Sequence, residues 1–381
     1  MDLFQHSINV ILENQHSEGA YIASPSFETY HFCWLRDGSF IAYSMDKAGQ
    51  FASAEAFYRW VGRVITRYAT KVDVLEGMLG RGEKPDYTAI LNTRFSLEGF
   101  EEERGDDGEW GNFQVDGYGS WLWGLAEHVK MTGDRSLLFE LIDPIKTTVR
   151  YLQMVWQLPN YDCWEEHPEY LHPYSLASIY GGLKAVSEFA DIPLLTESAR
   201  QAAVLAGEVK HFLAQYAIQD GRFSKHLFPA QKGQPVKPVL NSGVDASLLG
   251  LALPYAVFDL IDPAVSVTIQ AIEKDLHLPG GGVYRYKEDV YYGGGEWILL
   301  TAWLGWYYVL TGKKEQAREM LKWIENTAAE NGDLAEQVNV HLLAPDHFEP
   351  WVEKWGQVAS PLLWSHAMTI ILQKAIDVMS L

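Results

Sequence analysis

Two glutamates in distant loops carry the clearest chemical signal in this chain. Glu165 lies in the segment 160–166 and Glu336 in the segment 334–337, and each loop precedes an apolar helical stretch. Two carboxyl groups that meet in an aromatic-lined pocket can hydrolyse a sugar acetal, because one protonates the leaving oxygen while the other activates water or attacks carbon. An arbitrary pair of glutamates is usually solvated, so the assignment depends on the neighbouring loops.

Two further loops hold side chains that suit a sugar. In the first, Trp34 is followed by Arg36 and Asp37, whose donors and acceptors match vicinal hydroxyl groups. Capping of the next helix is an alternative role for Asp37, but it explains neither Trp34 nor Arg36. In the second loop, Trp110 follows the acidic stretch 101–109, which we interpret as a solvated loop tip rather than a metal site.

The composition limits the classes of function. The 381 residues carry a net charge of −20, which argues against nucleic acid or an anionic membrane surface as a partner. The 14 Trp and 20 Tyr residues are consistent with stacking on sugars, although core packing also uses such residues. The spacing of Cys and His fits no zinc site, and neither glycine triplet continues into a phosphate loop. No metal and no cofactor are therefore expected.

The sequence indicates a cytoplasmic protein. The N-terminus has no basic segment followed by an apolar run, as a signal peptide would have. The uncharged stretch 297–312 is too short to span a bilayer and is interpreted as a buried helix. Cys33 and Cys163 are too few for a disulfide framework. Each precedes a tryptophan of a motif, so the two are candidate neighbours, with buried free thiols as the favoured state. The sequence predicts no oligomeric state.

Helical patterns of two kinds alternate along the chain. One kind has an apolar face and a charged face and is typical of an outer helix, whereas the other is almost uncharged on all sides and is typical of the interior. The predicted inner helices are 37–48, 116–132, 174–190, 243–258, 295–311 and 361–380. The predicted outer helices are 2–16, 51–70, 134–157, 195–217, 262–274 and 313–331.

Six inner and six outer helices wound alternately describe an all-α (α/α)6 barrel, which we predict as a single domain over residues 1–381. Short turns lead from each inner helix except the last to the next outer helix. The long return connections contain most of the unusual residues, and they gather at the N-terminal ends of the inner helices. These ends carry the positive poles of the helix dipoles, so we expect a carboxylate-bearing site there.

Six segments resemble, in order, the motifs of the inverting glucoamylase family, glycoside hydrolase family 15. The resemblance covers nearly the whole chain. The family includes glucodextranases, isomaltose-cleaving enzymes and some trehalases, and its fold is the (α/α)6 barrel. The matching segments are Trp-Leu-Arg-Asp-Gly, Gln-Val-Asp-Gly-Tyr-Gly, Trp-Glu-Glu, Arg-Tyr with the later Asp-Val-Tyr and Gly-Gly, Ala-Glu-Gln, and Pro-Leu-Leu-Trp-Ser-His-Ala.

The resemblance implies a catalytic role for four residues. Glu165 is the implied general acid, and Glu336 is the implied general base that activates water. Ser365 is expected to hydrogen-bond to Glu336 and orient it, and Tyr30 is expected near the base and the water. The two carboxyl groups of an inverting enzyme are expected about 6.5–9.5 Å apart, which leaves room for the water.

The resemblance also implies which residues bind the sugar. The adjacent arginine and aspartate are expected to grip the hydroxyls of the terminal glucose, with two tryptophans packed around it. Glu166 and Arg285 are expected to contact the next sugar. The implied sugar-binding residues are Trp34, Arg36, Asp37, Trp110, Glu166 and Arg285.

These roles require different protonation states of the two carboxyl groups. We expect the charge of Glu166 and partial burial against Trp164 to raise the pKa of Glu165, so that it remains protonated as an acid. We expect a hydrogen bond donated by Ser365 to keep Glu336 ionised as a base.

The expected function is exo-acting hydrolysis of small α-gluco-oligosaccharides, with α-1,4 or α-1,6 linkages, that releases β-glucose from the non-reducing end. The β-sandwich and starch-binding domains of many family members have no counterpart in this sequence, which favours small soluble substrates. The alternatives are an α,α-trehalase of the same family and a non-catalytic sugar-binding or regulatory protein on the same barrel. The linkage depends on an outer subsite, for which the loops 82–110 and 338–360 give no prediction.

Overall fold

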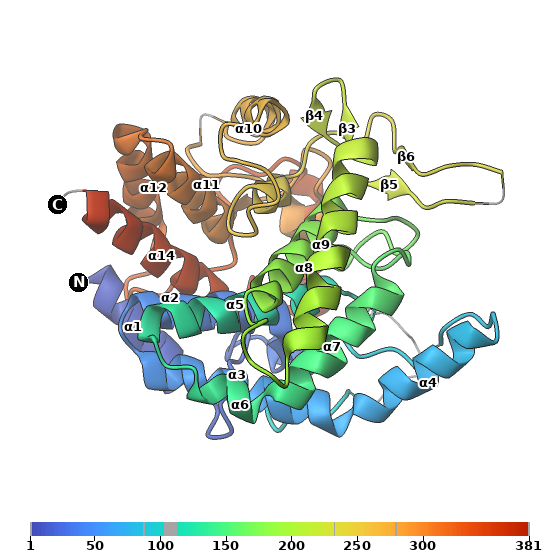
Figure 1. Cartoon of the computed structure of the whole chain (residues 1–381). Coiled ribbons are helices and arrows are strands. Elements are labelled where there is room, and N and C mark those ends of the chain that lie inside the picture. The colour runs from blue at the N-terminus through green and yellow to red at the C-terminus, as the bar shows by residue number, and fades with distance from the viewer. Residues whose placement is uncertain (1, 87, 103–112, 232, 279, 380–381) are drawn as a thin grey trace.

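The computed structural model describes residues 2–86, 88–102, 113–231, 233–278 and 280–379. Within these residues, six helical segments form a closed ring, because each packs against the next and the last returns to the first (Figure 1). The inner segments are α2 (Leu35–Lys47), α5 (Asp116–Thr132), α8 (Pro173–Ser187), the 3₁₀ helix η2 (Ala246–Leu251), α11 (Ile298–Leu310) and α14 (Leu363–Met379).

A second layer of helices packs against the outside of this ring. Each outer helix lies beside one or more of the inner segments. The outer helices are α1 (Leu3–Glu13), α3 (Phe51–Arg67), α7 (Ile142–Val155), α9 (Thr196–Tyr216), α10 (Pro263–Asp275) and α12 (Lys314–Thr327). The described chain is therefore the predicted alternation of inner and outer helices, an (α/α)6 barrel.

The distribution of apolar residues explains which helices lie inside. The uncharged helix α11 is buried along Ile298–Val309, whereas the charged helix α12 buries only Ala317, Met320 and Ile324. A helix that is apolar on all sides gains stability only when every side is covered, and an amphipathic helix needs cover on one face. The buried apolar side chains form one continuous core. The single domain over residues 1–381 stays a prediction.

Close contact between inner helices α5 and α8 depends on glycine. A Cβ atom on Gly119 would lie 2.2 Å from the carbonyl oxygen of Ser178, and one on Gly182 would lie 2.4 Å from the carbonyl oxygen of Gly119. Beside this contact, the hydroxyl groups of Ser120 and Ser178 lie 3.1 Å apart. The two backbones therefore approach too closely for any side chain at Gly119.

We expect Gly119→Ala to lower the free energy of unfolding by about 1–3 kcal/mol, because two rigid backbones must move apart. Denaturant unfolding followed by circular dichroism measures this loss. Gly207→Ala on outer helix α9 is the matched control. A Cβ atom there meets nothing within 4 Å, so the helix propensity of alanine is expected to stabilise the protein slightly. Equal effects of the two substitutions would contradict the close packing.

The fourth inner segment differs from the sequence prediction. We predicted an α-helix over 243–258, but the structure has only the short 3₁₀ helix η2, followed by turns. Pro254 has no N–H to donate, and its ring clashes with the carbonyl group four residues earlier in an α-helix. Ala256 then adopts a left-handed backbone conformation with φ of 50°. The apolar pattern correctly predicted a buried segment, but the prediction of an α-helix was wrong.

Among the described residues, three α-helices and one 3₁₀ helix in these regions were not predicted as separate elements. The predicted helix 134–157 is divided into α6 (Ser136–Glu140) and α7, and α4 (Ala69–Gly80) follows α3. In the loop 338–360, which gave no prediction, the structure has the 3₁₀ helix η4 (Pro345–His347) and α13 (Phe348–Trp355). Pro350 lies in the first turn of α13. The backbone N–H groups of a first turn have no partner within the helix, so a proline there costs no hydrogen bond.

In the part of the chain that the structure describes, four two-stranded antiparallel sheets connect the loops. Two of them lie at the N-terminal ends of inner helices: β1 (Cys33–Trp34) pairs with β2 (Arg94–Phe95), and β7 (Glu296–Trp297) pairs with β8 (Gln337–Val338). The others are β3 (Ile218–Gln219) with β4 (Arg222–Phe223), and β5 (Leu227–Phe228) with β6 (Lys237–Pro238). The 3₁₀ helices η1 (Glu28–Tyr30) and η3 (Tyr291–Gly293) complete the connections.

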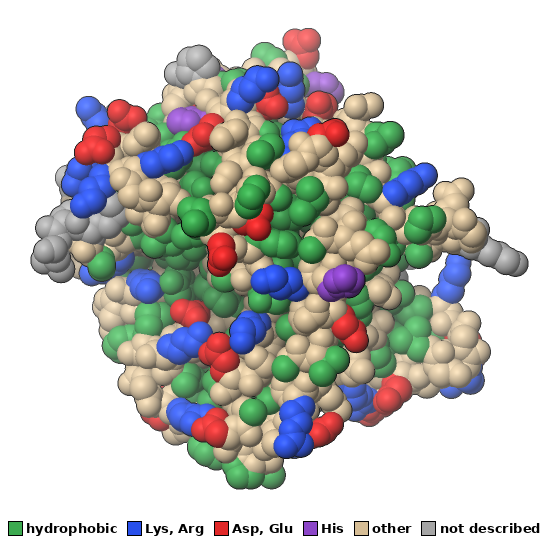
Figure 2. Space-filling model, turned by 45° about the horizontal axis from the view of Figure 1, so that its top comes forward, with side chains coloured by type: hydrophobic (Ala, Val, Ile, Leu, Met, Phe, Trp, Pro, Cys, Tyr) green, Lys and Arg blue, Asp and Glu red, His purple; other side chains and the backbone are tan. Residues whose placement is uncertain are grey.

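The surface carries charges of both signs. On the face seen in Figure 2, Lys and Arg side chains are interspersed with Asp and Glu. Across the part of the chain that is described, none of the helices combines the length and apolar character that a membrane span needs.

Candidate active site

A cavity of about 340 Å³ opens at the N-terminal ends of the inner helices. Trp34 directly precedes α2, Trp297 directly precedes α11, and Trp364 lies in the first turn of α14. All three tryptophans line the cavity, together with Glu165 and Glu336. The volume lies near the lower end of the range for small-molecule sites. The structure thus brings the two glutamates to one cavity, at the end of the barrel that the sequence predicted.

The position of Glu336 is set by the strand and loop on either side of it. The residue directly precedes β8, whose pairing with β7 fixes this segment to the start of α11. On the other side, the Glu336 N–H donates to the carbonyl of Ala359 at 2.9 Å, and the Leu362 N–H donates to the carbonyl of Leu334 at 2.9 Å. The base candidate is therefore held between the starts of α11 and α14.

The loop that carries Glu165 is a tight turn built around Asp162. One carboxylate oxygen of Asp162 accepts hydrogen bonds of 2.9 Å from the backbone N–H groups of both Trp164 and Glu166. The Asp162 carbonyl accepts from the Glu165 N–H at 3.0 Å. Glu165 itself adopts a left-handed conformation with φ of 65°. A non-glycine residue is strained there, so the surrounding hydrogen bonds must hold it in place.

Two aromatic side chains connect the two carboxyl groups. The indole N–H of Trp34 donates a hydrogen bond to Oε1 of Glu165. The hydroxyl of Tyr30 donates to Oε1 of Glu336 at 2.9 Å. The two rings pack edge to face with their centroids 5.6 Å apart. The predicted neighbourhood of Tyr30 and the base is confirmed, and Trp34 contacts the acid candidate directly.

The environment of Glu165 raises its pKa, as predicted, but only one of the two predicted causes acts. Desolvation in the cavity raises the pKa, and the positive charges of Arg94 and Arg36 oppose the rise. Glu166 was expected to supply a repulsive charge. Instead its carboxylate accepts a hydrogen bond of 2.5 Å from Tyr286 and lies 3.6 Å from the Arg285 guanidinium. The charge of Glu166 is thereby compensated, so burial, the second predicted cause, raises the pKa of Glu165, whereas the predicted contribution of Glu166 was wrong.

Glu336 is buried, and burial raises its pKa to about 7. The hydrogen bond from Tyr30 and the positive charge of Arg285 oppose this rise. Its Oε2 atom has no hydrogen-bond partner among the described residues. A buried carboxylate oxygen without a protein partner in a cavity wall is suited to hold a water molecule.

The predicted hydrogen bond from Ser365 to Glu336 is wrong. The Ser365 hydroxyl donates to the carbonyl oxygen of Ala335 at 2.8 Å. Ser365 lies in the first turn of α14 and is fully buried, so its hydroxyl needs a partner, and the nearest one is the backbone before Glu336. The serine therefore braces the backbone of the base and does not touch its carboxylate.

We expect Tyr30→Phe to move the acidic limb of the pH profile of kcat/KM to higher pH. In the wild type this limb is expected near pH 7, because Glu336 must be ionised to act as a base. The Tyr30 hydroxyl stabilises the ionised form, so its removal raises the pKa of Glu336 further. Tyr284→Phe is the control, since that hydroxyl donates to the carbonyl of His341. A limb that stays in place or moves to lower pH would contradict the assignment of Glu336.

Arg36 and Asp37 form a buried polar corner of the cavity. One guanidinium nitrogen of Arg36 donates to Asp116 at 3.0 Å and to Gln114 at 3.1 Å, so the start of α5 fixes the side chain. Nε of Arg36 lies 3.3 Å from Oδ2 of Asp37, and burial raises the pKa of Asp37 to about 6. These two atoms form a buried ion pair with each other, and both residues line the cavity. The corner therefore offers a positive and a negative group of the kind that binds sugar hydroxyls.

Arg285 forms a second charged centre in the cavity wall. Its guanidinium donates two hydrogen bonds to Asp289, of 2.7 and 2.5 Å. Four aromatic rings surround it at 5.1–5.4 Å, from Trp164, Tyr286, Tyr291 and Trp297. Glu166 and Arg285, which were predicted to contact the next sugar, both line the cavity. The structure therefore places this pair beside the two catalytic candidates.

Sequence reasoning missed one side of the cavity. Trp351, Lys354 and Trp355 of α13 line it, as does Tyr291. The spacing of four residues between the two tryptophans is a helical signal that could have identified them. Trp110 lies outside the described residues. Cys33 and Cys163 are buried free thiols, and Cys163 lines the cavity.

Comparisons with known proteins agree with this geometry. Residues 1–374 match the family described as glycosyl hydrolases family 15. The chain is 40% identical over 375 residues to isomaltose glucohydrolase from Kribbella flavida, covering 97% of this chain and 91% of that protein. It resembles a glycosidase structure solved in complex with glucose, with a TM-score of 0.89 and 38% identity over 99% of this chain and 96% of that one.

A more distant structure shares the fold. The crystal structure of a bacterial glucoamylase complexed with acarbose has a TM-score of 0.76 and 21% identity, covering 98% of this chain and 55% of that one. The helical ring and the carboxyl-bearing cavity at its mouth define a barrel-type glycoside hydrolase. The chain belongs to glycoside hydrolase family 15. It is a glucoamylase-like enzyme of this inverting family, an exo-acting glucosidase that releases glucose.

Proposed function

We propose that this enzyme hydrolyses short α-1,6-linked gluco-oligosaccharides such as isomaltose, one terminal glucose at a time. The observation that carries the proposal is the meeting of Glu165 and Glu336 in one cavity of about 340 Å³. The choice of linkage is supported by the similarity over almost the full length of both chains to an isomaltose glucohydrolase.

In the proposed mechanism, the corner formed by Arg36 and Asp37 binds hydroxyls of the terminal glucose. Glu165 transfers its proton to the glycosidic oxygen while the bond from that oxygen to the anomeric carbon breaks. Glu336 removes a proton from a water molecule whose oxygen forms the new bond to the opposite face of the anomeric carbon. The leaving sugar departs with the proton of Glu165, and the released glucose is the β-anomer.

The environments of the two carboxyl groups support these roles. Desolvation raises the pKa of Glu165, which favours the protonated form that an acid needs. Burial raises the pKa of Glu336 to about 7, and the hydrogen bond from Tyr30 and the positive charge of Arg285 limit this rise, so the base is ionised above about pH 7. The free Oε2 atom of Glu336 is the atom we assign to the water.

Side chains of α13 support an exo-acting mode. Trp351 and Trp355 line the cavity, and so does Lys354, which lies between them in the sequence of α13. In this proposal, their aromatic faces bind the sugar that leaves, because sugar rings stack on aromatic side chains. A wall of this kind limits how much chain can follow the terminal glucose.

A substrate panel tests the proposal. Isomaltose, maltose, trehalose and a dextrin are compared by kcat/KM, with glucose release as the readout. We expect the highest value for isomaltose. The trehalase alternative predicts the highest value for trehalose, and a general glucoamylase predicts the highest value for dextrin or maltose, so either result would contradict the proposed linkage.

A further inference from the structure

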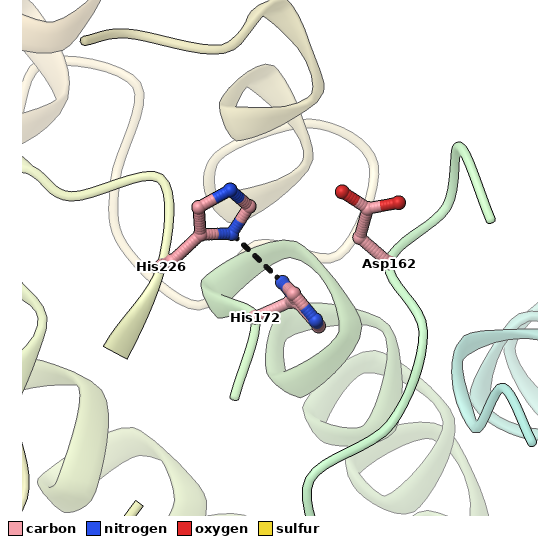
Figure 3. A group of neighbouring side chains, drawn as sticks. All are labelled: Asp162, His172 and His226. Atoms are coloured by element: carbon pink, nitrogen blue, oxygen red, sulfur yellow. Dashed lines mark hydrogen bonds between the residues drawn. The ribbon is translucent and has the colours of Figure 1, made fainter. Parts of the chain in front are cut away.

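Three buried side chains meet at the loop that carries Glu165, one of them from the loop itself. Asp162, His172 and His226 place one ligand-type atom each within 4.8 Å of one another. Figure 3 shows the two imidazoles side by side, with the Asp162 carboxylate next to them on a separate segment. His172 directly precedes α8, and His226 directly precedes β5. The proposed reaction does not use either histidine, so their role needs an explanation.

The partners of the two imidazoles fix the positions of their protons. Nε2 of His172 lies 2.7 Å from the carbonyl oxygen of Asn160 and 3.1 Å from that of His167. A carbonyl oxygen only accepts, so Nε2 of His172 carries a hydrogen. Nδ1 of His172 therefore accepts, and Nδ1 of His226, which is 3.0 Å away, donates to it. Burial lowers the pKa of both imidazoles, which agrees with two neutral rings.

The two carbonyl groups bound by His172 flank the catalytic acid. Asn160 precedes Glu165 and His167 follows it, so one N–H group holds both ends of the turn. Glu165 and His167 have left-handed backbone conformations, with φ of 65° and 54°. Such conformations are strained for residues other than glycine and persist only where the surroundings enforce them. A side chain that holds both ends of the turn supplies this enforcement.

Building on the proposed function, we infer that His172 is a positioning residue for the general acid, with its tautomer fixed by His226. Its Nε2–H group holds the backbone of the turn 160–167, so that the carboxyl group of Glu165 points at the glycosidic oxygen. Packing supports this arrangement, because the ring of Tyr170 stacks on His226 with centroids 5.2 Å apart.

A divalent cation bound by the same three residues is the competing interpretation. A cation that took Nδ1 of both histidines would break the hydrogen bond between them. The ammonium of Lys225 also acts on the group: its positive charge contributes to the lowered pKa of both histidines and opposes the burial-driven rise in the pKa of Asp162 to about 8. A second cation would be repelled by this ammonium. The geometry therefore favours the pair of neutral imidazoles.

The test compares two substrates that differ in their need for an acid. Isomaltose requires a proton on its leaving oxygen, whereas α-glucosyl fluoride releases fluoride with little help from an acid. We expect His172→Phe to lower kcat for isomaltose about 10²-fold with little change in KM. We expect its kcat for α-glucosyl fluoride to stay within about threefold of the wild type, because the step through Glu336 is intact.

Three variants serve as comparisons. His172→Gln places an amide nitrogen near the position of Nε2 and is expected to recover most of the activity on isomaltose. His211→Phe, on the exposed face of α9, is the matched control and is expected to behave like the wild type. If His172→Phe does not fold, as judged by circular dichroism, His226→Phe replaces it, since it removes only the donor to His172 and is expected to give the same pattern more weakly.

Three results would overturn the inference. The first is an equal loss of kcat for both substrates in His172→Phe, and the second is an unchanged kcat for isomaltose in that variant. The third is stoichiometric Zn²⁺ binding in calorimetry that requires His226, with activity lost on treatment with a chelator, which would establish a metal site.

The variant Glu165→Gln separates this inference from the proposed function. If Glu165 is the general acid, this variant must keep its kcat for α-glucosyl fluoride. If Glu165→Gln keeps its activity on α-glucosyl fluoride and His172→Phe loses it, only the role of His172 is refuted. A wild-type enzyme that is inactive on both substrates refutes the proposed function.

Discussion

Replacing Glu336 by glutamine is expected to lower kcat for isomaltose about 10²- to 10⁴-fold, and Glu165→Gln is expected to cause a loss of the same size, because each substitution removes one proton-transfer group. Glutamine has nearly the same shape, and its carbonyl oxygen can still accept the hydrogen bond that Tyr30 donates to Glu336. The fold is therefore expected to be unchanged. Steady-state kinetics with isomaltose, together with the melting temperature, measure both effects.

Glu319→Gln provides the control for these two variants, because this glutamate is exposed on outer helix α12. It is expected to retain the activity of the wild type. Near-normal turnover in Glu165→Gln or in Glu336→Gln would refute the assignment of that residue. A large fall in melting temperature would instead show that the residue holds the structure.

Arg36→Met is expected to cause the largest loss of stability, a decrease in the free energy of unfolding of about 3–5 kcal/mol. Its guanidinium lies 3.0 Å from the carboxylate of Asp116, and the side chains of the two residues are only 7% and 1% exposed. Methionine fills much of the space but leaves the Asp116 charge buried without its partner. Denaturant unfolding of the variant and the wild type measures the difference.

The double variant Arg36→Met with Asp116→Asn separates the charge from the packing. Asparagine removes the buried charge, so part of the lost stability is expected to return. If the single and double variants are equally destabilised, the loss comes from packing around Arg36 and the ion pair is not its cause.

The (α/α)6 architecture was predictable because uncharged and amphipathic helical segments alternate along the whole sequence. The contrast between uncharged segments such as 297–311 and amphipathic segments such as 313–330 identified inner and outer helices, since burial of a whole helix leaves no place for charge. The prediction failed where one residue overrides the pattern. Pro254 prevents an α-helix in the fourth inner segment, although the segment is as apolar as the others.

The candidate site was predictable in its members but not in their contacts. The motifs identified Glu165, Glu336 and Arg36, and the structure places all three in one cavity. Hydrogen-bond partners depend on distances of tenths of an ångström, which residue spacing does not fix. The hydroxyl of Ser365 thus reaches the backbone of Ala335 rather than the carboxylate of Glu336.

Other contacts arise only from the folded arrangement. The compensation of Glu166 requires Tyr286 and Arg285, which lie more than a hundred positions later in the sequence. Likewise, the pairing of His172 with His226 joins segments that no local motif connects. A cluster of this kind becomes visible only when the loops are placed in space.

Proton NMR of the glucose first released from isomaltose tests the central claim most directly. The account holds that Glu165 and Glu336 act from opposite faces of the anomeric carbon with a water molecule beside Glu336, so the first product must be β-glucose, which then converts slowly to the equilibrium mixture. Initial release of α-glucose would mean that one carboxylate attacks the sugar itself, and it would contradict the roles assigned to both residues.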